Sequence, residues 1–380
     1  MKKYAGTFIC ILFTGLFITC SSAPKVDLTG VTSYYVRANG NDRNAGISED
    51  APFKTLTHAV QTASKTSVKT ITVIGTLNEC TVIDKVNKTQ FEVNKVTDAS
   101  NESFNFHMQN LNQFGVAMLS GSYDNKNPEE ILITGKPNAT EAEKAVLISD
   151  GKYPTLQINL SAIRLENIEI IGNKTPCIAM GGSDLILAKG AKITQSPYFG
   201  ILSMASVLIM RDNAEVSYNS GSNNVGIELA SGSVGILLDN ALVTHNKSTG
   251  NCGGIALSGS TLYLRDNATV SNNSAGGYGG GILTFPDKKN GYISMLEISD
   301  NASVVKNNAN IGGGILIQDL LFLYDNVNIS ENSAAKEGGG VFALTDGASV
   351  IVNADKVNDI IRNNHAPVYP NINMDFNKIE

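Results

Sequence analysis

A short motif that recurs at nearly constant spacing between residues 186 and 352 constrains the fold of this chain more than any other feature. Each copy starts with an Asp-Asn pair, has a β-branched residue four positions after the Asp and an Asn three positions later, and closes with Gly and an aliphatic residue. The aspartates are Asp212, Asp239, Asp266, Asp300 and Asp325, so the steps are 27, 27, 34 and 25 residues. The β-branched residues are Val216, Val243, Val270, Val304 and Ile329, and the asparagines are Asn219, Asn246, Asn273, Asn307 and Asn332. Four features in mutual register through five units indicate a repeat architecture.

The number of strands and the length of one unit indicate which repeat architecture the chain adopts. Three short β-rich runs, exemplified by Leu262–Leu264, Thr269–Ser271 and Ile282–Thr284, alternate with corners rich in Asp, Asn and Gly. No run has the length or the periodicity of a helix. Three strands in about 27 residues fit one turn of a parallel β-helix, with turns stacked about 4.8 Å apart. A propeller blade needs four strands and about 40 residues. The sequence therefore predicts an all-β solenoid.

The recurring asparagines predict a ladder inside this solenoid. In stacked turns, Asn219, Asn246, Asn273, Asn307 and Asn332 would lie one above another, each side-chain amide bonding the next. Such a column satisfies polar groups at the edge of an apolar interior.

The motif resembles the repeats of right-handed parallel β-helix proteins of the pectin-lyase-like superfamily. The pairing of Val-x-x-Asn with Gly-Gly-x-Ile is also similar to the repeats of polymorphic outer-membrane adhesins, with Val or Ile here where those repeats have Phe. The resemblance covers roughly residues 34 to 370. It implies a single-stranded right-handed parallel β-helix with an N-terminal capping helix.

The N-terminus has the pattern of an export signal. Lys2 and Lys3 precede an apolar run that is too short and too early to be a membrane-spanning helix. The segment before Cys20 resembles a bacterial lipoprotein signal, which predicts a signal peptide over residues 1–19 and lipidation of Cys20. The alternative is ordinary secretion with an incidental cysteine. Residues 20–33 then form a polar tether.

The remaining boundaries follow the pattern along the chain. Residues 34–69 are expected to hold a strand and a capping helix over Pro52–Ser64, because a solenoid must cover its end coils. The β-helix is expected over 70–365, with a long excursion within 79–130 and the Val-x-x-Asn signature continuing at Ile360 and Asn363. Residues 366–380 form a C-terminal cap or tail.

Composition excludes some functions. The net charge of −6 argues against nucleic acid as a partner. The scattered cysteines and histidines form no zinc motif, and Cys177 and Cys252 are expected in the coil interior. No metal or cofactor is predicted. The aspartates of the column are interpreted as turn residues whose charge Arg211 and Arg265 would neutralise, and His245 is interpreted as a solvated corner residue. A calcium-dependent lyase site in that column is the less favoured alternative.

An insertion in one repeat unit is a candidate ligand-binding site. The 34-residue step contains an insertion whose side chains include Phe285, Lys288, Lys289 and Tyr292. Loops inserted on one side of a solenoid commonly carry specificity, so these residues are candidates for contacting an acidic glycan or protein. A tolerated surface insertion is the alternative.

These observations predict a bacterial envelope protein that is exported and lipid-anchored, at the outer membrane or cell surface. Its partners would be the membrane, through the N-terminal lipid, and a glycan or a host or envelope protein held on the β-helix. The second hypothesis is a polysaccharide lyase or glycosidase on the same fold, because fold alone does not decide function. The catalytic signatures of polygalacturonase-like hydrolases are absent, and no catalytic residue is assigned.

Overall fold

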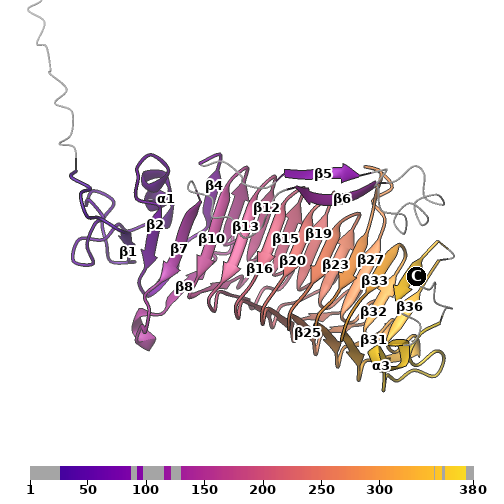
Figure 1. Ribbon diagram of the computed structural model, residues 1–380. Helices are drawn as coiled ribbons and strands as arrows, with labels where there is room; N and C mark the ends of the chain where they lie inside the picture. Colours follow the sequence, from indigo (N-terminus) through magenta and orange to yellow (C-terminus); the bar gives the residue numbers. More distant parts are fainter. Residues whose placement is uncertain are drawn as a thin grey trace, which may run out of the picture. The chain divides into compact units, whose positions relative to one another are not determined.

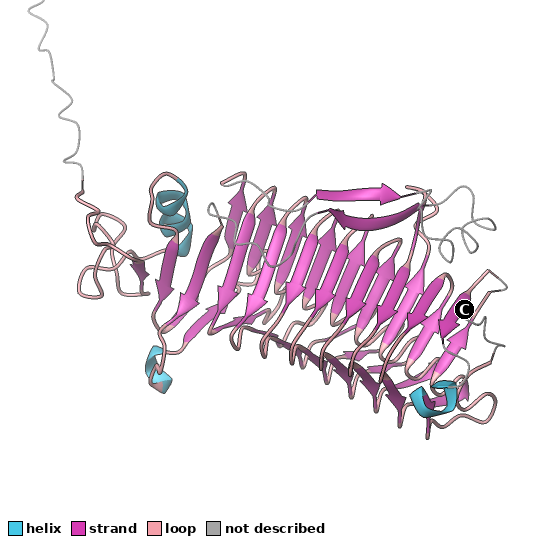
Figure 2. Cartoon of the chain, viewed as in Figure 1, coloured by secondary structure: helices cyan, strands magenta, loops and turns pink. Residues whose placement is uncertain are grey.

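Parallel strands from successive repeats lie side by side and form three long sheets of a right-handed parallel β-helix (Figure 1). The computed structural model describes residues 26–86, 92–96, 115–120, 130–345, 347–352 and 356–373. Residues 31–380 form one compact unit, separate from residues 1–30, and the description concerns that unit. The predicted fold class is confirmed, since the described chain is almost entirely strand and loop (Figure 2).

Each long sheet takes one strand from nearly every coil. Sheet A has 11 strands: β1 (Tyr34–Val36), β2 (Thr70–Val73), β7 (Ile131–Gly135), β10 (Ala162–Glu166), β13 (Asp184–Ala188), β16 (Val207–Met210), β20 (Val234–Leu237), β24 (Thr261–Leu264), β29 (Met295–Ile298), β33 (Leu320–Leu323) and β37 (Ser349–Val352). Sheet B has 10: β3 (Thr76–Asn78), β8 (Ala145–Ile148), β11 (Ile168–Ile171), β14 (Lys192–Thr194), β17 (Glu215–Ser217), β21 (Leu242–Thr244), β25 (Thr269–Ser271), β30 (Ser303–Val305), β34 (Asn328–Ser330) and β38 (Ile361–Arg362). Sheet C has nine: β4 (Thr81–Asp84), β9 (Leu156–Asn159), β12 (Ile178–Gly181), β15 (Ile201–Met204), β19 (Ile227–Ala230), β23 (Ile255–Ser258), β27 (Ile282–Phe285), β32 (Ile315–Ile317) and β36 (Val341–Ala343).

A fourth short strand adds to the three expected in each unit. Five coils contribute to sheet E, which comprises β18 (Ser220–Gly221), β22 (Lys247–Ser248), β26 (Ser274–Ala275), β31 (Asn308–Ile311) and β35 (Ser333–Glu337). These strands follow the ladder asparagines. Their Ser, Gly and Asn content is typical of corners, so these segments carry no strand signal in the sequence.

The core lies inside the coils because strand residues alternate inward and outward. In sheet B, Val216 pairs with Val243, and Val270 pairs with Val304, so these residues form one inward column whose members are fully buried. The corners take left-handed backbone: the five aspartates of the motif all have φ between 53° and 58°. Asp tolerates that conformation, which explains its recurrence.

The recurring Gly before each sheet C strand has a steric cause. A Cβ on Gly254 would lie 2.2 Å from the Gly281 carbonyl oxygen, and one on Gly281 would lie 2.6 Å from that of Gly314. Successive coils approach too closely there for any side chain, so the position admits only glycine.

Helix α1 (Leu56–Ser64) covers the first coil, packing against β1, β2 and β4. It starts four residues later than predicted, because Thr55 caps it by accepting a hydrogen bond from the His58 N–H, while Phe53 bridges to Val36 as extended chain. The carboxylate of Glu79 accepts from the Leu56 N–H at 3.0 Å and so satisfies a second orphan donor of the helix. A 3-10 turn, η1 (Glu141–Glu143), and helix α3 (Val357–Ile360) are the other described helical elements.

The signature at the end of the solenoid lies one residue later than predicted. Ile361, rather than Ile360, pairs with Ile329, and Asn364, rather than Asn363, accepts from Asn332. Asn363 takes the left-handed corner conformation that Glu331 has one coil earlier. Helix α3 supplies the offset, because it replaces the usual Asp-Asn corner.

The irregular segment predicted within residues 79–130 begins later than predicted, and its strand β6 pairs with a strand of the insertion. Strand β4 is a regular member of sheet C, so the period holds as far as Asp84. Beyond it, β5 (Glu92–Val96) and β6 (Gly115–Ser120) form an antiparallel pair that runs across the row of solenoid strands (Figure 1). β6 also pairs in parallel with β28 (Tyr292–Ile293) in the insertion, which completes the three-stranded sheet D.

Candidate functional site

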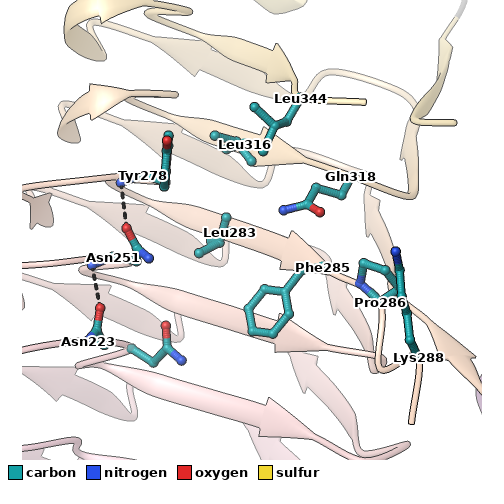
Figure 3. Close-up of a pocket in the computed structure, with 11 residues that line it drawn as sticks. Asn223, Asn251, Tyr278, Leu283, Phe285, Pro286, Lys288, Leu316, Gln318 and Leu344 are labelled. Atoms are coloured by element: carbon teal, nitrogen blue, oxygen red, sulfur yellow. Dashed lines mark hydrogen bonds between the residues drawn. The ribbon is translucent and has the colours of Figure 1, made fainter. Parts of the chain in front are cut away.

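A groove of about 520 Å³ opens on the outer face of sheet C, over the later coils (Figure 3). Its lining combines apolar residues with four side-chain amides and one charged group. The lining residues are Asn223, Asn224, Asn251, Tyr278, Leu283, Phe285, Pro286, Lys288, Leu316, Gln318 and Leu344.

An apolar column runs along the outward positions of sheet C, and two of its members, Leu283 and Leu316, form the floor of the groove. Ala256 pairs with Leu283, Leu283 with Leu316, and Leu316 with Phe342. These four residues form one buried cluster with Cys252, although they point away from the coil interior. The sequence shows them only as the second residue of each short strand, so an inward position was equally compatible with their apolar character.

The first wall is a short amide ladder on three successive coils (Figure 3). The Asn223 Oδ1 accepts a hydrogen bond from the Asn251 N–H at 2.9 Å, and the Asn251 Oδ1 accepts from the Tyr278 N–H at 3.2 Å. The wall therefore uses the amide oxygens of both asparagines. Tyr278 at its end is 40% exposed, which leaves its ring available to a ligand.

The second wall is the insertion, which contributes Phe285, Pro286 and Lys288 (Figure 3). Asp287 and Tyr292 exchange two backbone hydrogen bonds, at 2.8 and 3.1 Å, and close the insertion into a small hairpin. The Asp287 carboxylate accepts from both the backbone N–H and the side-chain amide of Asn290, which fixes the tip. The insertion is thus an ordered wall rather than a free loop.

Two of the four predicted ligand-binding residues line the groove and two do not. Phe285 and Lys288 line the groove, whereas Lys289 is exposed and does not. Tyr292 packs on the opposite side, against the outer face of sheet A beside Ile236 and Ala117. Gly232 leaves room for it, since a Cβ there would lie 2.8 Å from the Tyr292 ring. Tyr292 therefore anchors the wall that presents Phe285 and Lys288.

The base of the insertion is fastened by Ser294 and Asp319. The Ser294 hydroxyl donates to the Phe285 carbonyl at 2.8 Å, and the Ser294 N–H donates to the Asp319 carboxylate at 3.0 Å. Burial raises the pKa of Asp319 to about 7, against the opposing effects of the Ser294 hydrogen bond and the nearby Lys288 ammonium.

A carboxyl group lies just beyond the floor. Glu228 occupies the outward position one coil before Ala256 and accepts a hydrogen bond from the Asn224 side chain. Burial raises its pKa. It marks the end of the apolar floor toward the N-terminal coils.

The five ladder asparagines occupy one buried column. Each donates its side-chain N–H to the Oδ1 of the next, at 2.9 Å from Asn219 to Asn246, 3.0 Å to Asn273, 3.1 Å to Asn307 and 3.0 Å to Asn332. The Oδ1 of Asn219 also accepts the Ser196 N–H, and the Oδ1 of each later asparagine accepts the backbone N–H of the asparagine before it. The column continues through Asn364 to Asn371. The column supports the coils and lies away from the groove.

A second ladder was missed from the sequence. At the corner between sheets C and A, backbone N–H groups donate to the serine hydroxyl of the next coil, through Ser161, Ser183, Ser206, Ser233 and Ser260. Ser294 continues the column, and Asp319 ends it. A signal was present, because the steps from Ser233 through Ser260, Ser294 and Asp319 are 27, 34 and 25 residues, as for the motif aspartates.

The aspartate column forms a third ladder of hydrogen bonds. Asp239 accepts the Asp212 N–H at 2.9 Å, and the pattern repeats through Asp325. Arg211 contacts Asp239 at 3.6 Å, but Arg265 turns away to Glu297, at 2.8 Å, and lies over the Tyr263 ring. Only Arg211 of the two thus approaches the column. His245 is exposed at its corner and stacks on Tyr218.

No family model, no curated protein and no solved structure matches this chain. Within the described ranges, no His, Cys, Asp and Glu cluster has the size and geometry to hold a metal ion. No helix among the described residues has the length and apolarity to cross a membrane. Cys20, the predicted lipidation site, lies outside the described residues. Cys177 and Cys252 are buried thiols, and burial raises the pKa of each.

Proposed function

We propose that the chain is an exported, lipid-anchored protein of the bacterial envelope whose β-helix binds a ligand in the groove on sheet C. The observation that carries the proposal is the lining of that groove. An apolar floor lies between a wall of amides and a wall with an aromatic ring and a cation. Binding sites typically combine a mainly apolar surface with a few placed polar groups in this way.

The resemblance to the β-helix superfamily supports the same view of the molecule, and the pattern that ends at Cys20 supports export and anchoring. The polymorphic adhesins that the repeats resemble suggest a surface role. The alternative is a polysaccharide lyase or a glycosidase, and a glycosidase needs two carboxyl groups flanking the scissile bond. Of the described residues that line the groove, none is a carboxylic acid, which favours binding over hydrolysis.

A matched pair of substitutions tests whether the groove is the binding surface. Leu344 lines the groove, directly follows strand β36 of sheet C and is 42% exposed. Met204 is 47% exposed, ends strand β15 of the same sheet in an earlier coil, and lies outside the groove. Because both side chains are exposed, neither L344D nor M204D should unfold the protein. On an array of defined peptides and glycans, L344D should lose the binding that wild type and M204D show. Equal binding by both variants, or no binding by wild type, would contradict the proposal.

A further inference from the structure

The insertion that forms the second wall of the groove is joined at its base by Ser294. Phe285 is the last residue of strand β27, and Ser294 directly follows β28, so the two residues flank the insertion. The Ser294 hydroxyl donates to the Phe285 carbonyl at 2.8 Å and lies 3.1 Å from the Leu257 carbonyl oxygen in the coil before. The position of the wall therefore depends on how firmly Ser294 is held.

The group that holds Ser294 departs from the column of serines to which Ser294 belongs. In the earlier coils, a backbone N–H of this column donates to a serine hydroxyl, as from Ser233 to Ser260 at 3.1 Å. The Ser294 N–H donates instead to the carboxylate of Asp319, at 3.0 Å, and Asp319 is only 2% exposed. A serine would hold the same N–H without titrating. Asp319 thus adds an ionisable group where the scaffold requires none.

The surroundings of Asp319 favour its neutral form. Strand β33, which starts at the next residue, is apolar and buried throughout. On the side of the following coil, the Ser349 N–H donates to the Asp319 backbone carbonyl rather than to the carboxylate. From the insertion, the Lys288 ammonium favours the ionised form, while Asp287 directs its carboxylate to the tip and Lys289 is exposed. Burial outweighs the Lys288 ammonium and raises the pKa of Asp319 to about 7.

The insertion is attached in a way that permits local opening. Asp287 and Tyr292 bond each other and so close the insertion on itself. The bonds of Ser294 and the parallel pairing of β28 with β6 attach it to the rest of the chain. Segments held by a few such bonds open while the core stays folded. An open insertion would expose Asp319 to water.

The sign of the pH effect follows from this exposure. In the closed insertion the Asp319 carboxyl keeps its proton up to about pH 7, whereas an exposed aspartate loses it near pH 4. Between these values the closed form binds more protons than the open form. Acid therefore favours closure, and each unit of rising pH shifts the balance toward opening by up to about tenfold.

We propose that Ser294 and Asp319 form a pH-sensitive latch, which holds the insertion on the solenoid while Asp319 is neutral and releases it when Asp319 ionises. Release moves the wall that carries Pro286 and Lys288 (Figure 3). The latch then regulates the groove, and that consequence alone rests on the proposed function.

Hydrogen–deuterium exchange on the full chain tests the latch without a ligand. Mass spectrometry follows peptides that cover residues 285–296 and, as a control for the fold, strand β12 (Ile178–Gly181). After correction for the intrinsic pH dependence of exchange, the protection of residues 285–296 in wild type should fall at least about tenfold between pH 5 and pH 8. The protection of β12 should stay within about twofold.

D319N is the informative variant, because asparagine still accepts the Ser294 N–H and does not titrate. Its insertion should be protected nearly equally at pH 5 and pH 8. D325N removes an exposed carboxyl group at the next corner and should keep the wild-type fall. The latch is overturned if wild type shows no fall, if D319N shows the same fall, or if β12 loses protection in parallel. Such a failure leaves the binding groove standing, and a failure of the ligand array leaves the latch standing.

Discussion

Asn273 sits in the middle of the asparagine column and has partners in both neighbouring coils. Its side chain accepts from the N–H and the amide of Asn246, and donates to Asn307 and to the Val243 carbonyl, at 2.9 to 3.1 Å. The column was predictable because one residue type recurs at a fixed offset from a stronger signal. The serine column has the same period, but Ser is common in turns of every kind, so its periodicity stood out less.

Replacing Asn273 by Leu should destabilise the protein strongly. The change removes the bonds of Asn273 and strands buried polar groups on Asn246 and Val243, at about 1–3 kcal/mol for each group. The measurement is the free energy of unfolding in a denaturant titration. Asn267 is the control, because it is exposed at the corner of the same coil and its replacement by Leu should cost no more than about 0.5 kcal/mol. If the two variants unfolded at the same denaturant concentration, the column would not be a source of stability.

At the scale of elements, the sequence predicted the regular coils better than the segments that depart from them. The repeat predicted the sheet A, sheet B and sheet C strands of the regular units because local pattern and long-range pairing agree there. The hairpin β5–β6 has no period, and its pairing of Gly115 with Tyr292 joins two irregular segments far apart in the chain. No local propensity encodes that contact. Only part of the groove was therefore predictable from the sequence. Phe285 and Lys288 were predicted because they lie in the insertion, whereas the residues of the amide wall and the floor occupy repeat positions, where the sequence predicts scaffold residues.

Asp319 gives the stability of the fold a pH dependence. The folded-state pKa of about 7 is above the ordinary aspartate value, so between about pH 4 and pH 7 the folded protein holds a proton that the unfolded chain has lost. The stabilisation from that proton is present at low pH and is lost as the pH rises toward 7. We expect the free energy of unfolding to fall by a few kcal/mol over this range, at about 1.4 kcal/mol per pKa unit. Urea titrations at a series of pH values measure it.

Two asparagine variants isolate this effect. D319N keeps the shape of the side chain without its titration, so the decline between pH 4 and pH 7 should become much shallower. Asp325 lies exposed at the next corner of the chain, and D325N should leave the decline in place. A D319N profile parallel to that of wild type would show that another group governs the pH dependence.

At the scale of the whole molecule, the predicted lipid anchor and the proposed binding groove lie far apart along the chain. The predicted lipidation site is Cys20, and the groove is built from coils after residue 222. Because residues 31–33 belong to the compact unit, the part of the predicted tether before it, residues 20–30, would reach at most about 3.3–3.6 Å per residue, or roughly 40 Å. An extended tether of that length would let the groove meet a ligand away from the membrane surface. This arrangement is useful only if the chain is acylated.

Replacing Cys20 by Ala should therefore release the protein from the membrane. Each buried CH₂ of an acyl chain contributes about 0.8 kcal/mol to membrane binding, and no helix among the described residues supplies a substitute. In cells fed labelled palmitate, wild type should carry label and sediment with membranes, whereas C20A should carry none and remain soluble. Cys10 provides the matched control, because it lies within the apolar run of the same leader. C10A should keep both label and membrane association. Label retained on C20A would mean that Cys20 is incidental, and release without any label on wild type would favour ordinary secretion.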